Sequence, residues 1–139
     1  MNIFGTLDTA GSGLKVMRTW MDAVGDNIAN MNDAVRTSDP AFAQRFVMAS
    51  ANNYGQAGQP GITAGAKVDG VLFGDSTGRL VYDPSSPLAD AQGMVRYPDV
   101  DLGEQMSQLI VAQRGYQANL SVVDRVRDAY SAALTIGKG

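Results

Sequence analysis

The sequence contains neither cysteine nor histidine in its 139 residues. Without cysteine there are no disulfides and no thiol chemistry. Without histidine, the Ser-His, Cys-His and His-metal arrangements of many hydrolases and zinc enzymes cannot form. The enzymatic option that remains is chemistry carried by carboxylates alone.

The sequence also lacks a long apolar run and a dense basic cluster. No stretch approaches the roughly 20 consecutive apolar residues that cross a bilayer, so we expect no transmembrane segment. The 11 basic and 14 acidic side chains leave a net charge of −3, and we expect no nucleic-acid partner. Residues 1–13 lack the charged and apolar regions of a cleavable signal, so we expect no signal cleavage.

Aromatic residues are scarce, at 7%, whereas glycine occurs 16 times. Large side chains that could nucleate a core are therefore few. We expect an extended or modular shape.

Both ends of the chain carry apolar residues at alternating steps of four and three, which is the repeat of a helix that packs on another helix. The first series is Ile3, Leu7, Ala10, Leu14, Met17, Met21, Val24, Ile28 and Met31. The second is Leu102, Met106, Leu109, Gln113, Tyr116, Leu120, Val123, Arg127, Tyr130 and Leu134. We expect helices over about 6–30 and 102–136 that pack as a coiled coil, either within one molecule or between molecules.

Local residues affect the stability and the ends of both helices. Glycines at positions 5, 11, 13 and 25 weaken the first, since each interior glycine costs about 1 kcal/mol relative to alanine, so it should form only against a partner. Asp101 and Glu104 predict a capping box at the start of the second, and Gly137 and Gly139 predict its end. Trp20 is off the first stripe, which predicts that it lies on the outer face.

Between the helices, residues 35–99 read as loops with short strands. We expect a strand over 42–50, a flexible loop over 54–65, and a hairpin that joins 68–73 to 79–82 around Gly74 and Gly78. Pro84 and Pro87 should then end strand pairing. The predicted fold is mainly α with a small β or irregular middle, in three segments: 1–34, 35–99 and 100–139.

Three acidic residues, Asp99, Asp101 and Glu104, form the best candidate for carboxylate chemistry. They lack the mid-loop glycine and further oxygen ligands of a calcium loop, and a helix start favours negative charge. We therefore predict that the protein is not an enzyme and has no catalytic residue, cofactor, metal or small-molecule substrate. A small carboxylate-dependent hydrolase remains the alternative from another class.

Several motifs resemble those of the flagellar axial proteins, the family of rod, hook and junction subunits. GDNIANMN begins at Gly25 and RGYQANLSVVD at Arg114, while VYDPSSP and GMVRYPDVDLGEQM look like the proximal rod subunits in particular. The residues that carry the resemblance are Asn27, Ile28, Ala29, Asn30, Tyr82, Asp83, Pro84, Tyr97, Pro98, Tyr116, Gln117, Ala118 and Asn119.

The resemblance implies a structural subunit that is exported through the flagellar type III export apparatus, without signal cleavage, and assembles in the periplasmic space. Its partners would be copies of itself and other rod subunits, in a hollow, torque-transmitting shaft of the basal body. The alternative within this family is another rod or hook-type subunit. The expected assembly interface is Leu7, Leu14, Met17, Met21, Val24, Ile28, Leu102, Met106, Leu109, Tyr116, Leu120, Val123, Tyr130 and Leu134.

Overall fold

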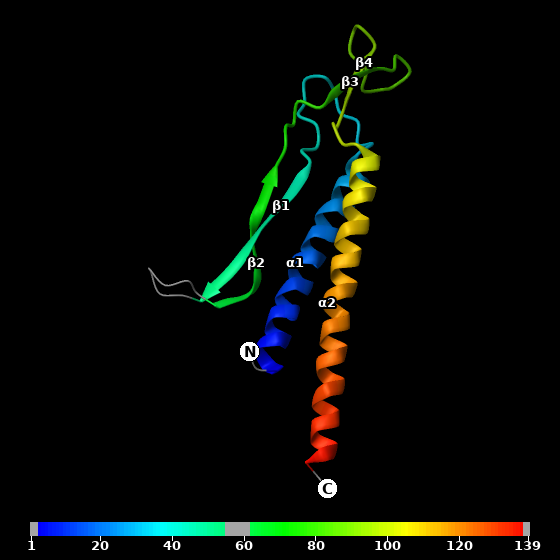
Figure 1. The fold of residues 1–139 in the computed structure, drawn as a ribbon. Coiled ribbons are helices and arrows are strands. Elements are labelled where there is room, and N and C mark those ends of the chain that lie inside the picture. The colour runs from blue at the N-terminus through cyan, green and yellow to red at the C-terminus, as the bar shows by residue number, and fades with distance from the viewer. Residues whose placement is uncertain (1–2, 55–61, 138–139) are drawn as a thin grey trace.

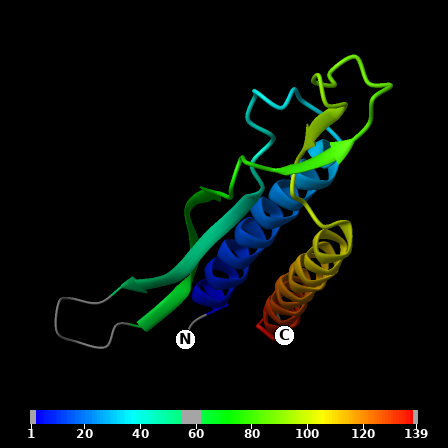
Figure 2. The same cartoon turned by 90° about the horizontal axis from the view of Figure 1, so that it is seen from above.

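Two long helices from opposite ends of the chain lie side by side and run antiparallel (Figures 1 and 2). A computed structural model describes residues 3–54 and 62–137. Its elements are α1 (Ile3–Asn30), β1 (Arg45–Tyr54), β2 (Ile62–Phe73), β3 (Arg79–Tyr82), β4 (Met94–Tyr97) and α2 (Leu102–Ile136). The prediction of two terminal helices around a small strand region is confirmed, whereas coiled-coil geometry and the three-segment division stay predictions.

The helix ends follow local chemistry. Helix α2 has the predicted bounds, and α1 begins three residues earlier than expected. The Asp101 side chain accepts a hydrogen bond from the Glu104 amide at 2.7 Å, as predicted. The Glu104 carboxylate binds the side chain of Gln108 at 2.9 Å instead, so only half of the capping box is confirmed. Substituting such a cap typically costs about 1 kcal/mol.

The C-terminal end of α2 differs from the expected glycine stop. Gly137 keeps a right-handed conformation, with φ at −74°, and its amide donates to the Ala133 carbonyl at 3.0 Å. The left-handed freedom of glycine is therefore not used here. The predicted contribution of Gly139 lies outside the described residues.

The strands form two separate antiparallel hairpins, β1 with β2 and β3 with β4. The predicted hairpin between 68–73 and 79–82 is therefore wrong: Phe73 pairs with Arg45, and Arg79 pairs with Tyr97. Residues 74–78 therefore join the two hairpins instead of closing one. Within this segment Gly78 has φ at +61°, and a Cβ there would lie 2.3 Å from the Tyr97 carbonyl oxygen. Strand β4 was not predicted.

The other expectations for the middle segment are partly met. The strand expected over 42–50 begins at Arg45 and continues to Tyr54, and β2 already begins at Ile62, inside the expected loop. Residues 55–61 of that loop lie outside the described residues. Strand β3 ends at Tyr82, before Pro84, as predicted.

Helix α1 lies between α2 and the β1–β2 hairpin (Figure 2). The β3–β4 hairpin lies at one end of the helix pair (Figure 1), where Val35 and Arg96 exchange backbone hydrogen bonds. The buried apolar residues are mostly small: Ala10, Val16, Ala23, Val24, Ala41, Val95, Val100 and Ala112. The molecule is accordingly elongated, as the composition predicts.

Candidate assembly interface

Small and polar residues lie at the points of closest contact between α1 and α2. A Cβ added to Gly13 would lie 2.8 Å from Asn119 Oδ1, and one added to Gly115 would lie 2.7 Å from Met17 Sδ. Such approaches leave no room for larger side chains at the two glycines. Along this contact, which we call the seam, α1 and α2 therefore pack closely.

The seam follows the predicted stripes only in part. On α1 it keeps the stripe residues Met17 and Val24, but it uses positions 13, 20 and 27 where the stripe has 14, 21 and 28. On α2 it uses 105, 112 and 119 where the stripe has 106, 113 and 120. One residue corresponds to a rotation of about 100° around a helix. Because the two helices are antiparallel and the displacement has the same sense on both, the stripe residues outside the seam turn toward one side of the pair.

That side, which we call the stripe face, is apolar and incompletely covered. Thr19 and Val16 line the surface that faces the hairpin, and the stripe residues lie on the far side of α1 from them. The α1 residues are half-buried, whereas three of the α2 residues are exposed. The stripe face consists of Leu7, Leu14, Met21, Ile28, Leu102, Met106, Leu109 and Leu120.

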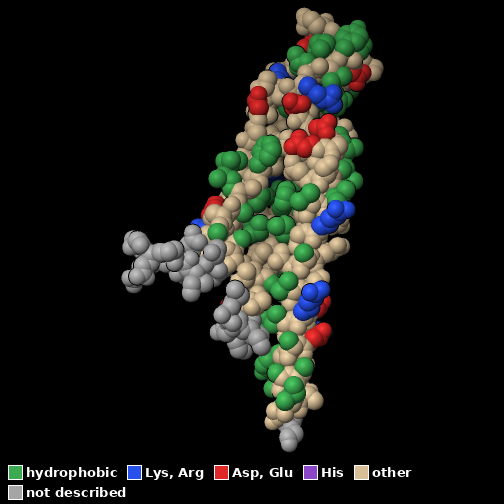
Figure 3. Space-filling view, viewed as in Figure 1, with side chains coloured by type: hydrophobic (Ala, Val, Ile, Leu, Met, Phe, Trp, Pro, Cys, Tyr) green, Lys and Arg blue, Asp and Glu red, His purple; other side chains and the backbone are tan. Residues whose placement is uncertain are grey.

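Helix α2 extends past the beginning of α1 (Figure 1). Since Gly13 faces Asn119, Ile3 comes opposite about residue 129, ten residues further along each helix. We call residues 130–136 the overhang. Its apolar residues Tyr130, Leu134 and Ile136 are 46%, 50% and 81% exposed. Figure 3 shows apolar side chains along α2 down to this end, with isolated charges between them.

The remaining predicted interface residues lie in or near the seam. Val24 is fully buried, and Met17, Tyr116 and Val123 are half-buried. Trp20 corrects our prediction of an outer position: its indole Nε1 donates to Gln108 Oε1 of α2 at 3.4 Å. The helix rotation that moves the seam off the stripe also turns Trp20 inward.

One buried polar cluster, which we call the junction, joins three elements. Asn27 Nδ2 donates to Gln105 Oε1 at 2.9 Å and to the Arg45 carbonyl at 3.0 Å, and Asn27 Oδ1 accepts from the Arg45 amide at 2.8 Å. Asn27 and Gln105 are fully buried, and Asp26 pairs with the Arg45 guanidinium. The polar seam position at Gln105 was missed because hydrophobic periodicity does not register amides.

The other motif residues have structural roles. Asn30 Nδ2 donates to the Asp26 carbonyl at 2.7 Å, and the Asp83 carboxylate holds the turn after β3 through the Ser85 hydroxyl at 2.7 Å. Pro98 is buried and Tyr97 is half-buried. Ala29, Tyr82, Pro84, Gln117 and Ala118 are exposed.

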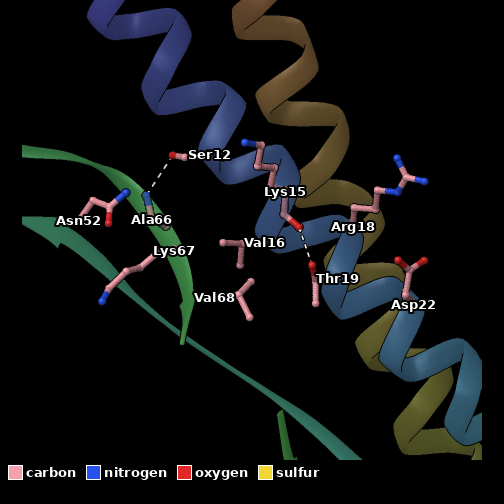
Figure 4. A pocket seen from close by; sticks show the side chains of 10 residues that line it. All are labelled: Ser12, Lys15, Val16, Arg18, Thr19, Asp22, Asn52, Ala66, Lys67 and Val68. Atoms are coloured by element: carbon pink, nitrogen blue, oxygen red, sulfur yellow. Dashed lines mark hydrogen bonds between the residues drawn. The ribbon is translucent and has the colours of Figure 1, made fainter. Parts of the chain in front are cut away.

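Two hollows separate α1 from the hairpin. One, of about 290 Å³, is lined by Val16, Met17, Trp20, Val47 and Ala49. The other, of about 560 Å³, is polar at its rim, but Figure 4 shows Lys15, Arg18 and Lys67 pointing in different directions. The three cations do not converge on a common point, so this hollow does not have the form of an anion site.

Two of the three acidic residues at the start of α2 take part in local hydrogen bonds. Asp101 and Glu104 are engaged in the helix start and in the bond to Gln108. Over residues 3–54 and 62–137, no acidic residues gather in a group suited to a metal ion. In the same part of the chain, no helix has the length and apolar character needed to cross a bilayer.

Comparison with known proteins identifies the family. Residues 91–136 match the family described as flagellar basal body rod FlgEFG protein C-terminal. The chain is 36% identical to the flagellar basal-body rod protein FlgC of Salmonella typhimurium, over 99% of this chain and 98% of the relative. The proteins of the same name from Bacillus subtilis and Borreliella burgdorferi are each 32% identical over at least 99% of this chain and their full length.

The motifs, the paired terminal helices and the full-length relatives agree. The similarity to the relatives extends over the helices, both hairpins and the junction, and is not limited to one shared motif. This chain therefore belongs to the family of the flagellar basal-body rod protein FlgC.

Proposed function

We propose that this chain is a non-enzymatic subunit of the proximal rod, which assembles with copies of itself and with other rod subunits into a hollow shaft that transmits torque. The stripe face is the observation that carries the proposal. The seam combines Met17, Trp20 and Val24 with glycines, an alanine and amides. The apolar side chains of α2 beside it, Leu102, Met106 and Leu120, stay exposed and are free to contact another molecule.

The exposed residues of the stripe face fit assembly better than solvation. Leu102, Met106 and Leu120 are each 44–45% exposed, and burying such side chains on association contributes about 25 cal/mol per Å² of apolar surface. Repeated around a shaft, many such contacts resist torsion without any single strong bond.

We also propose export through the flagellar type III apparatus into the periplasmic space, without signal cleavage. The glycines of α1 support it, because a helix that is weak by itself unfolds readily and forms again against a partner. The names of the relatives favour a rod subunit over the hook-type alternative. A carboxylate-dependent hydrolase is not favoured, since Asp101 and Glu104 serve the start of α2.

Replacing Leu120 by aspartate tests the stripe face. Leu120 is 44% exposed and lies beside the seam, so Leu120→Asp should lower the free energy of unfolding by about 1 kcal/mol, which leaves the chain folded. Cells that carry it in place of the native chain should lose swimming and yield no complete rods on purification. Leu109→Asp should act in the same direction, but Leu109 is half-buried and its loss would also disturb the fold.

The matched control is Ala118→Asp. Ala118 is also exposed and lies on the opposite side of α2, two residues and about 200° from Leu120. This variant should retain rods and swimming. Normal rods in the Leu120→Asp strain, or equal damage by Ala118→Asp, would refute assembly through the stripe face.

A further inference from the structure

We propose that Asn27 couples two events: the pairing of α1 with α2, and the docking of the β1–β2 hairpin on α1. The side-chain amide of Asn27 is the connecting part. It binds Gln105 of α2 and both backbone groups of Arg45, the first residue of β1, within 3.0 Å. The inference concerns the fold alone and does not depend on the rod function.

The contacts between elements offer few other ways for α2 to affect the β1–β2 hairpin. Among the described residues, neither β1 nor β2 packs directly on α2; both strands pack on α1. The hairpin rests on α1 over the two hollows of about 290 and 560 Å³, where apolar packing is incomplete. Polar anchors must therefore contribute much of its attachment.

Among the described residues, the polar contacts between α1 and the hairpin lie at its two ends, and they differ in their dependence on α2. The Asp26–Arg45 ion pair at the near end is partly exposed and uses α1 alone, so it contributes little. At the far end of the hairpin, Ser12 Oγ accepts from the Ala66 amide at 3.0 Å, and Gly65 lies so close that an added Cβ would be 2.0 Å from Ser12 Oγ. That anchor uses α1 alone. At the near end, the Arg45 backbone is held by an amide that α2 buries and orients.

Asn27 donates a hydrogen bond to the buried side chain of Gln105. Gln105 is fully buried, and its Nε2 has no hydrogen-bond partner in the described part of the chain. Its Oε1 accepts one of the two Asn27 Nδ2 protons, while the Arg45 carbonyl accepts the other. If α2 moves away, that Nδ2 proton loses its partner and water can compete for the amide. The near end of the hairpin should then loosen.

Amide hydrogen exchange in the full chain tests this coupling with the Gln105→Leu variant. The substitution removes a group of α2 that forms no hydrogen bond to the hairpin. The Arg45 amide, which donates to Asn27, should exchange at least tenfold faster. The Ala66 amide, which donates to Ser12, should keep its rate.

The matched control is Gln108→Leu, which also removes a hydrogen bond between the helices, the one to Trp20. It should leave Arg45 exchange unchanged. Unchanged Arg45 exchange in Gln105→Leu would overturn the proposal. So would an equal acceleration in Gln108→Leu, or equal acceleration of Arg45 and Ala66.

A measurement on the unmodified chain keeps the test valid if Gln105→Leu fails to fold. In mild denaturant, amides that open in one event share one denaturant dependence. The Arg45 amide should open together with the α2 amides around Ala112, and the Ala66 amide should not. The coupling would be refuted if the Arg45 amide opened at a lower denaturant concentration than the α2 amides around Ala112.

Discussion

Single side chains with local hydrogen bonds determine how the β3–β4 end is built. The Asp90 carboxylate accepts hydrogen bonds from the amides of Gln92 and Met94, both at 2.9 Å. Between them Gly93 has φ at +74°, a conformation that favours glycine. The turn into β4 is thus held by one charged acceptor.

These bonds make the turn sensitive to acid. The Met94 amide, followed by the Gln92 amide, lowers the pKa of Asp90 below its ordinary value of 3.8. A depressed folded-state pKa contributes stability that is present above 3.8 and is lost as the pH falls through the lowered value. The Met94 amide resonance should therefore titrate with a midpoint below 3.8.

The control for this titration is Asp90→Asn. It should abolish the dependence at Met94 and leave the helix resonances unchanged. A midpoint at or above 3.8 in the unmodified chain would contradict the assignment.

At the scale of elements, the glycines of α1 fall into two groups. Nothing lies within 4 Å of a Cβ added to Gly11 or Gly25, whereas Gly13 is packed against Asn119. The open glycines only weaken the helix, while Gly13 also permits the close approach of α2. The sequence alone does not separate these roles.

Replacing an open glycine should strengthen α1. We expect Gly25→Ala to raise the free energy of unfolding by about 1 kcal/mol, as measured by urea denaturation followed by circular dichroism. Gly13→Ala should gain less or lose stability, because Asn119 must move. A larger gain from Gly13→Ala than from Gly25→Ala would show that the close approach at the seam is not needed.

Elements specified by nearby residues were predictable, and pairings between distant residues were not. Helix α2 has its cap at Asp101 and its periodicity within one segment, so its bounds followed directly. The partner of β2 is β1, whose paired residues lie 8 to 28 positions earlier in the chain, whereas the glycines at 74 and 78 suggested a partner that follows β2. The predicted stripes included Met17 and Val24 of the seam, but Gly13, Gly115 and Gln105 were missed because a hydrophobic pattern does not register glycines and amides.

At the scale of the whole molecule, the overhang is the part of the described helices with least internal support. Leu134 is 50% exposed and lies beyond the first described residue of α1. Leu134→Asp should leave the free energy of unfolding within about 0.5 kcal/mol of the native value. It should also prevent the chain from copurifying with basal bodies, as measured by quantitative mass spectrometry.

Ala132→Asp is the control for the overhang. Ala132 is exposed and lies on the opposite side of α2 from Leu134, so its variant should copurify normally. Native amounts of Leu134→Asp in purified basal bodies would show that the overhang is dispensable for assembly.

The exposed part of the stripe face also has a consequence for solution thermodynamics. If copies of the chain associate through it, as we propose, Leu102, Met106 and Leu120 gain burial that the single chain does not provide. Binding that occurs only in the folded state raises stability by mass action. The free energy of unfolding should then rise with the concentration of the chain, so that dilute and concentrated samples differ in stability.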